Sequence, residues 1–174
     1  LYVIQSDDDS LLRSTSYNLG VTLLRRRKLE GRRTPPASFV FDEADLFIPQ
    51  QSAEVYGETG FEQSRTIATQ IARRGRKFGV GLAIATQRIT YLDTSILGQP
   101  HTYFVSKLPR DSDREKVGQA FGLSDETMIQ TLRFSKGQWL LVSYDATGVE
   151  GFPVPVQLPD ANVRIRDFVT NYSP

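Results

Sequence analysis

The chain has 174 residues, 39% of them hydrophobic, which is enough to bury the core of one domain, and a net charge of +1 that does not by itself indicate a nucleic-acid-binding protein. It contains no cysteine, which excludes disulfides and thiolate metal sites and fits a cytoplasmic protein, and its single histidine argues against a histidine-based metal cluster. No apolar run approaches the roughly 18 residues of a membrane-spanning helix, so these residues predict no membrane partner.

Strands and helices are predicted to alternate along the chain, which indicates an α/β fold. In chain order, the first half predicts a strand at residues 1–5, a helix at 11–29 behind an acidic cap, a turn at 31–36, a strand ending at Asp42-Glu43, a helix at 62–78 and a strand at 79–87. The second half predicts a short strand at 102–106, a helix capped by Asp111, a short helix capped by Ser124, a strand at 138–144 with Trp139 in the core, and an extended segment at 153–156. We divide the chain into a domain at 1–144 and a Pro- and Gly-containing tail at 145–174, expected to act as an arm over the domain or a neighbouring subunit.

The most informative segment is Phe39-Val40-Phe41-Asp42-Glu43, in which an apolar strand ends in two adjacent carboxylates. This is the pattern of a Walker B element in a P-loop ATPase. There the aspartate holds Mg²⁺, usually through water, and the glutamate orients or deprotonates the water that attacks the γ-phosphate. Open α/β sheets also place their ligands at the carboxyl ends of strands. On this strand alone, an Asp-Glu pair that caps the next segment explains the pattern equally well.

A second apolar strand, at residues 79–87, favours the functional interpretation. Its small and branched side chains are typical of a strand buried on both faces of a parallel sheet. The preceding helix carries Ile67, Ile71 and Phe78 roughly on one stripe, so the order strand–helix–strand predicts a right-handed crossover unit. Both strands then end at the same sheet edge, which places Gln87 to hydrogen-bond the attacking water or the γ-phosphate.

Four segments resemble the HerA/FtsK superfamily of hexameric DNA-pumping ATPases, and the HerA branch is the closer match. They are Asp42-Glu43-Ala44, residues 72–79, Ala85-Thr86-Gln87-Arg88, and Ser135-Lys136-Gly137-Gln138-Trp139-Leu140, where FtsK-like motors have a turn that feeds the next strand. The resemblance is specific over about residues 38–144. Two features depart from it: Ile89 stands where the family usually has proline, and residues 49–60 form a longer polar loop than the usual connection.

This resemblance implies a RecA-like three-layer P-loop NTPase fold with a mainly parallel sheet, in an enzyme that couples hydrolysis of ATP, with Mg²⁺, to translocation on double-stranded DNA. Asp42 would then bind Mg²⁺ and nucleotide, Glu43 would activate water and Gln87 would contact the γ-phosphate. The family's arginines match Arg73 and Arg76, which would stabilise transition-state charge in the site of a neighbouring subunit. A hexameric homo-oligomer, with a nuclease partner in DNA end processing or repair, is also implied.

Two alternatives stay open. One is a conjugation or secretion ATPase of VirB4/VirD4 type, which an upstream membrane anchor would favour. The other is a non-hydrolysing domain that binds nucleic acid or serves in assembly. The intact Asp42, Glu43 and Gln87 argue against the second alternative, because an idle site has no chemical need for both carboxylates.

No phosphate-binding loop of the form Gly-x-x-x-x-Gly-Lys-Ser/Thr occurs in the 174 residues. That loop supplies the backbone cradle for the phosphates and the lysine for the β- and γ-oxygens. We therefore interpret the sequence as the carboxyl-terminal half of a P-loop domain, with an incomplete fold. Alone, it is expected to be inactive as an ATPase.

Basic residues gather in two runs, at residues 25–33 and 73–77. Each run lies near the end of a predicted helix, where the helix dipole favours each cation by about 0.3–1 kcal/mol. That effect explains either run without a ligand. Phosphate contact is the alternative for the first run, and the transition-state role of Arg73 and Arg76 is the alternative for the second.

Overall fold

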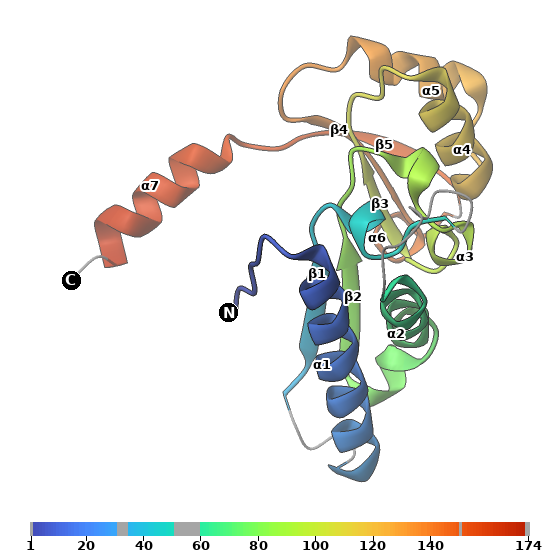
Figure 1. Ribbon diagram of the computed structural model, residues 1–174. Coiled ribbons are helices and arrows are strands. Elements are labelled where there is room, and N and C mark those ends of the chain that lie inside the picture. The colour runs from blue at the N-terminus through green and yellow to red at the C-terminus, as the bar shows by residue number, and fades with distance from the viewer. Residues whose placement is uncertain (1, 31–34, 51–59, 150, 173–174) are drawn as a thin grey trace. The chain divides into compact units, whose positions relative to one another are not determined.

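The computed structural model describes four segments of the chain: residues 2–30, 35–50, 60–149 and 151–172. The chain divides into two compact units, Leu1–Pro100 and His101–Pro174, each with its own sheet (Figure 1). Among the described residues, no helix is both long and apolar enough to cross a membrane.

The first unit holds a strand–helix–strand crossover. Its elements are α1 (Asp9–Glu30), β1 (Ala37–Phe41), η2 (Ala44–Leu46), α2 (Phe61–Arg74), η4 (Gly75–Phe78), β2 (Val80–Ile84), η5 (Ile89–Tyr91) and α3 (Thr94–Leu97). β1 and β2 pair in parallel, from Ala37 opposite Val80 to Phe41 opposite Ile84. The predicted crossover through the helix at α2 is therefore confirmed, with the last turn tightened into the 3₁₀ helix η4.

Helix α1 begins at Asp9, two residues before its predicted start. The carboxylate of Asp8 accepts hydrogen bonds from the backbone amides of Ser10 (2.9 Å) and Leu11 (3.1 Å), which would otherwise lack partners in the first turn. The Ser10 hydroxyl also donates to this carboxylate, and together these bonds lower the pKa of Asp8. The acidic segment predicted as a cap therefore caps the helix.

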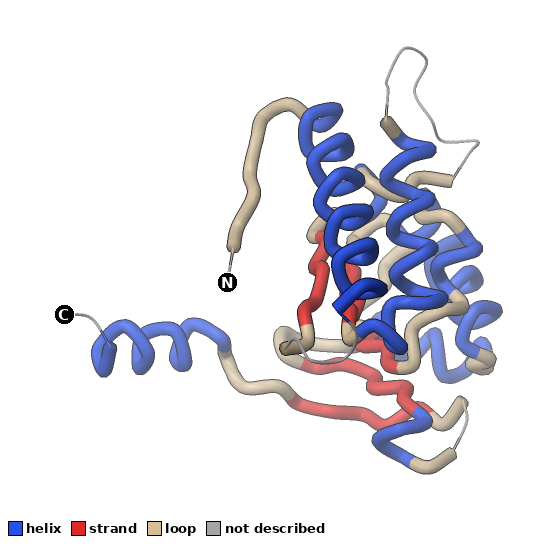
Figure 2. The backbone as a smooth tube through the Cα atoms, turned by 90° about the horizontal axis from the view of Figure 1, so that it is seen from below, coloured by secondary structure: helices blue, strands red, loops and turns tan. Residues whose placement is uncertain are grey.

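Helices α1 and α2 lie side by side along the β1–β2 pair (Figure 2). They approach closely at Gly20, where a Cβ atom would lie 2.3 Å from Cγ1 of Ile67. Beneath them, the buried residues Leu24, Ile67, Ile71 and Val80 form one cluster, with Phe39 packed against it. The alternation of burial along β1 leaves its other face exposed, and Val40 is 70% accessible.

The second unit is built on an antiparallel sheet of order β3-β4-β5. Its elements are β3 (Thr102–Val105), α4 (Asp111–Phe121), α5 (Asp125–Gln130), η6 (Thr131–Arg133), β4 (Gln138–Ser143), α6 (Tyr144–Thr147), β5 (Pro153–Gln157) and α7 (Ala161–Tyr172). Tyr103 of β3 stacks on Phe121 of α4, with ring centroids 3.7 Å apart. The predicted cap at Ser124 is confirmed, since its side chain accepts from the amide of Thr127. Trp139 is only half-buried.

Three expectations about the fold are corrected. The sheet is not mainly parallel, because only β1 and β2 pair that way in the described residues; apolar runs predict burial but not strand direction. Residues 2–5, the described part of the strand predicted at 1–5, form no strand, since a strand needs a neighbour for its hydrogen bonds, and Tyr2 is 97% exposed. The helix predicted to be capped by Asp111 has Arg110 at its cap position instead.

The structure is thus a mixed α/β chain with two small sheets. Of the predicted three layers, the described residues of the first unit provide one sheet layer and the helices on one of its faces. The predicted turn at 31–36 lies largely outside the described residues. The division into 1–144 and 145–174 stays a prediction, although β5, within that tail, pairs with β4.

Candidate functional site

Asp42 and Glu43 follow β1 at the same sheet edge at which Gln87 follows β2. Beyond the last strand pair, the amide of Ala85 donates to the carbonyl of Phe41, and the amide of Ala44 donates to the carbonyl of Ala85, both at 2.9 Å. These bonds hold the two strand ends together past the sheet. The side chains of Asp42, Glu43 and Gln87 are all exposed there, where a ligand can reach them.

Glu43 is the single non-glycine residue with a positive φ in the described part of the chain, at φ 49° and ψ 51°. A residue with a Cβ atom pays about 1–2 kcal/mol for this left-handed conformation. The neighbouring bonds keep it in place: the amide of Glu43 donates to Asp42 Oδ1 (3.1 Å), and its carbonyl accepts from Leu46 (2.9 Å). Such strain is concentrated at functional sites, and Glu43 is one of the residues that the sequence predicts to be functional.

Thr86 and Asp45, which the sequence analysis did not select, connect the two strand ends through their side chains. The Thr86 hydroxyl donates to Asp45 Oδ1 at 2.7 Å and accepts from the amide of Arg88 at 3.0 Å. The guanidinium of Arg88 lies 4.2 Å from the ring centroid of Tyr91. Since Asp45 and Thr86 are 41 positions apart in the sequence, no local pattern could have paired them.

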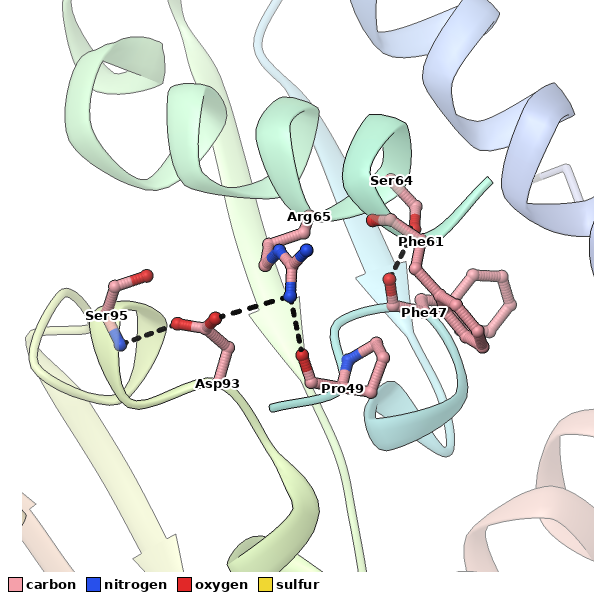
Figure 3. A network of polar contacts seen from close by, with 7 residues as sticks. All are labelled: Phe47, Pro49, Phe61, Ser64, Arg65, Asp93 and Ser95. Atoms are coloured by element: carbon pink, nitrogen blue, oxygen red, sulfur yellow. Dashed lines mark hydrogen bonds and ion pairs between the residues drawn. The ribbon is translucent and has the colours of Figure 1, made fainter. Parts of the chain in front are cut away.

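Helix α2 holds the loops that follow these strand ends (Figure 3). The guanidinium of Arg65 donates to the carbonyl of Pro49 (3.3 Å) and lies 3.9 Å from a carboxylate oxygen of Asp93. The hydroxyl of Ser64 donates to the carbonyl of Phe47. Asp93 in turn caps α3 by accepting from the amide of Ser95 at 2.8 Å. The loops after β1 and β2 are therefore fixed to the same helix.

Arg73 and Arg76 lie at the other edge of the sheet. The carbonyl of Gly79, directly after η4, accepts from the amide of Ala37 at 2.9 Å, so the basic segment is placed where β1 and β2 begin. Four exposed basic side chains line a shallow surface depression of about 370 Å³ there: Arg73, Arg74, Arg76 and Lys77. The structure thus brings Asp42, Glu43 and Gln87 to one edge and separates both arginines from them by the length of the strands.

Two arginines of the first basic run, Arg26 and Arg27, make polar contacts within the protein. Arg27 is buried, and its guanidinium donates to the carbonyl of Pro35. Arg26 Nε donates a hydrogen bond to Glu30 Oε1 at 2.6 Å, and this bond raises the pKa of Arg26. Arg32 and Arg33 lie outside the described residues. These contacts favour a structural account of Arg26 and Arg27 over phosphate binding.

The chemistry of the exposed strand end fits Mg²⁺ held mostly by water. In the described segments, no three His, Cys, Asp or Glu side chains gather in a way that could hold a metal ion. Asp42 would provide one carboxylate, with water and phosphate oxygens as the other ligands, which is the usual way proteins bind Mg²⁺. Asp42 Oδ1 accepts from the Glu43 amide, which fixes the orientation of this carboxylate.

No protein-family model matches the chain. Over 108 residues, or 62% of the chain, it is 33% identical to the DNA double-strand break repair helicase HerA of Pyrococcus furiosus and 32% identical to a probable helicase of Methanocaldococcus jannaschii. The chain is a distant homologue of the HerA helicases. It spans about a fifth of these relatives' length, since the matches cover 18% and 20% of them.

Two solved structures resemble this chain in fold. VirB4 of Thermoanaerobacter pseudethanolicus superposes with a TM-score of 0.62 over 92% of this chain and 40% of its own, at 17% identity. The genome packaging NTPase B204 of Sulfolobus turreted icosahedral virus 2, solved with ATPγS, superposes with a TM-score of 0.51 over 70% of this chain and 52% of its own, at 14% identity. The chain therefore has a mixed α/β fold that resembles parts of these two proteins.

Proposed function

We propose that this chain is part of an ATP-driven double-stranded DNA translocase or helicase of HerA type that acts in DNA end processing or repair. The observation that carries the proposal is the placement of Asp42-Glu43 and Gln87 at one sheet edge, joined by backbone bonds through Ala85. The distant homology to HerA helicases supports the choice of reaction and of DNA as the partner.

In this proposal, Asp42 holds Mg²⁺ through water, and Glu43 accepts a proton from the attacking water or orients it. Gln87 donates hydrogen bonds to the γ-phosphate or to that water. Bound Mg²⁺-ATP would supply the phosphoryl group and neutralise part of its charge. The left-handed backbone at Glu43 would set the direction in which its side chain leaves the end of β1 before nucleotide arrives.

Arg73 and Arg76 are proposed to act on the nucleotide site of an adjacent subunit in a hexameric ring. Both side chains are exposed at the sheet edge opposite Asp42 and Glu43. Such an arginine stabilises transition-state charge and is commonly worth about 10³–10⁵ in rate. Their exposure allows contact with another subunit, whereas the strands separate them from their own carboxylates.

The decisive experiment is steady-state ATP hydrolysis by the full-length protein, with and without double-stranded DNA. Glu43→Gln should reduce kcat by about 100-fold or more, because the amide keeps the shape of the side chain but does not accept a proton. Nucleotide affinity should stay within about threefold of the wild type, since binding does not need the proton transfer. Glu62→Gln, the same change at an exposed position in the first turn of α2, is the matched control and should hydrolyse normally.

Two results would contradict the proposal. Glu43→Gln with more than roughly a tenth of wild-type kcat would remove the general-base role, which is worth about 10²–10⁴. A wild-type protein that binds DNA but hydrolyses no ATP would instead indicate a non-hydrolysing binding domain.

A further inference from the structure

The hydroxyl of Thr86 makes two hydrogen bonds whose directions can be assigned. Its Oγ1 lies 3.0 Å from the amide nitrogen of Arg88 and 2.7 Å from Oδ1 of Asp45. The amide can only donate, so it occupies a lone pair of Oγ1 and leaves the hydroxyl proton for Asp45. A hydroxyl that donates to an ionised carboxylate forms one of the stronger hydrogen bonds in proteins.

The bond from Arg88 closes a turn around Gln87. A threonine hydroxyl that accepts from the amide two residues on fixes the backbone of the residue between them. Gln87 is that residue, and its side chain is exposed. Thr86 therefore determines the direction in which Gln87 leaves the end of β2.

The bond to Asp45 connects this turn to the one that carries Glu43. Asp45 lies in η2, which starts immediately after the left-handed Glu43. Backbone bonds through Ala44 and Ala85 already join the two strand ends, so the side-chain bond is not needed for strand pairing. The side-chain bond joins Asp45 and Thr86, which directly follow the backbone-bonded residues Ala44 and Ala85. It therefore fixes the position of Asp45 relative to Thr86.

We infer that Asp45 and Thr86 form a positioning pair that holds the Glu43 turn against the Gln87 turn. The inference rests on the proposed function, because it assigns the pair to the geometry between the group that activates water and the group that contacts the γ-phosphate. The pair acts through Glu43 and Gln87.

The test compares Thr86→Val, Thr86→Ser and Asp45→Ala in the full-length protein, by kcat and KM for DNA-stimulated ATP hydrolysis. Thr86→Val keeps the branched shape but removes both hydrogen bonds and should lower kcat about tenfold or more, since small misplacements of reacting groups cost up to about 100-fold. KM for ATP should change less than about threefold, because the pair does not bind the nucleotide. Thr86→Ser restores the hydroxyl and should return kcat to within about threefold of the wild type. Thr66→Val, at an exposed position on α2, is the matched control and should be unaffected.

A double-mutant cycle separates a pair from two independent residues. If Asp45 and Thr86 act through their mutual bond, Asp45→Ala combined with Thr86→Val should lose little more kcat than the worse single variant. If the two losses multiply, the pairing is refuted. A loss of kcat that Thr86→Ser does not restore also overturns the inference, because the hydroxyl would then not be the group that matters.

The outcomes also distinguish this inference from the proposed function. Normal kcat in Thr86→Val beside an inactive Glu43→Gln overturns the positioning pair and leaves the proposed function standing. Absence of ATP hydrolysis in the wild type, or an active Glu43→Gln, overturns the proposed function and this inference with it. Loss in Thr86→Val, rescue by Thr86→Ser and non-additivity with Asp45→Ala together support the pair.

Discussion

The left-handed backbone of Glu43 predicts an unusual order of stabilities. At φ 49°, alanine carries the same Cβ penalty as glutamate, about 1–2 kcal/mol, whereas glycine does not. Both Glu43→Ala and Glu43→Gly remove the exposed side chain, so their difference isolates the backbone term. We expect Glu43→Gly to be more stable than Glu43→Ala by about 1 kcal/mol, after allowing for the greater flexibility of glycine in the unfolded chain.

The same two substitutions at Gln70, an exposed position inside α2, give the control. There the order should reverse, with the glycine variant less stable than the alanine variant by about 1 kcal/mol. Thermal and urea unfolding of the 174-residue chain, followed by circular dichroism, would measure the four free energies of unfolding. At this size, 1 kcal/mol corresponds to a Tm shift of about 2–4 °C. Equal stabilities at position 43, or the same order as at Gln70, would show that the Glu43 backbone is not strained.

Two further predictions concern the remaining structure. Gly75→Ala should destabilise the chain by about 1–3 kcal/mol in urea unfolding, because a Cβ at this buried residue would lie 2.3 Å from the backbone carbonyl oxygen of Val80. Gly98→Ala is the control and should be near neutral, because no atom lies within 4 Å of its Cβ. Equal effects of the two substitutions would contradict the steric argument. The 174 residues alone should neither hydrolyse ATP nor bind it tightly, since they lack a phosphate loop; micromolar affinity for a fluorescent ATP analogue with Mg²⁺ would refute the half-domain interpretation.

The sequence was sufficient to predict the crossover and the placement of its polar ends. The apolar runs before Asp42 and Gln87 and the helical stripe between them reflect burial, which is a periodic property of the chain. The same logic was wrong for the strand predicted at residues 1–5, whose described residues have no neighbouring strand, and for the second sheet, whose strands pair antiparallel. Periodicity in the sequence indicates which side chains are buried. It does not indicate which strands pair with each other, or in which direction.

The geometry of the candidate site required the structure. The left-handed backbone conformation at Glu43 could not be predicted, because this conformation is usually adopted by glycine or asparagine and not by glutamate. The bond between Asp45 and Thr86 depends on the register of β1 against β2, and one residue of slippage would separate them. The sequence therefore indicated Asp42 and Glu43 by their position at a strand end, but the side-chain bond that joins the two strand ends arises from tertiary structure.

The position of Arg73 and Arg76 leads to a prediction about assembly. β1 rises about 13 Å from Ala37 to Phe41, and the arginines lie before its start while Asp42 and Glu43 lie beyond its end. An arginine side chain directed from one sheet edge does not reach the other, so a role in hydrolysis requires a second subunit.

Alanine at the responsible arginine should preserve nucleotide binding and ring formation but remove DNA-stimulated hydrolysis, whereas Arg74→Ala, at the exposed neighbour, should remain active. Rings mixed from the arginine variant and Glu43→Gln contain some interfaces at which an intact Glu43 meets an intact arginine of the next subunit. These rings should recover part of the ATPase activity that each parent lacks. If subunit exchange is verified and the mixed rings stay inactive, although isolated intact sites in other mixtures still hydrolyse ATP, the arginines do not act across the interface. The basic segment is then the end of a helix whose cations are favoured by its dipole.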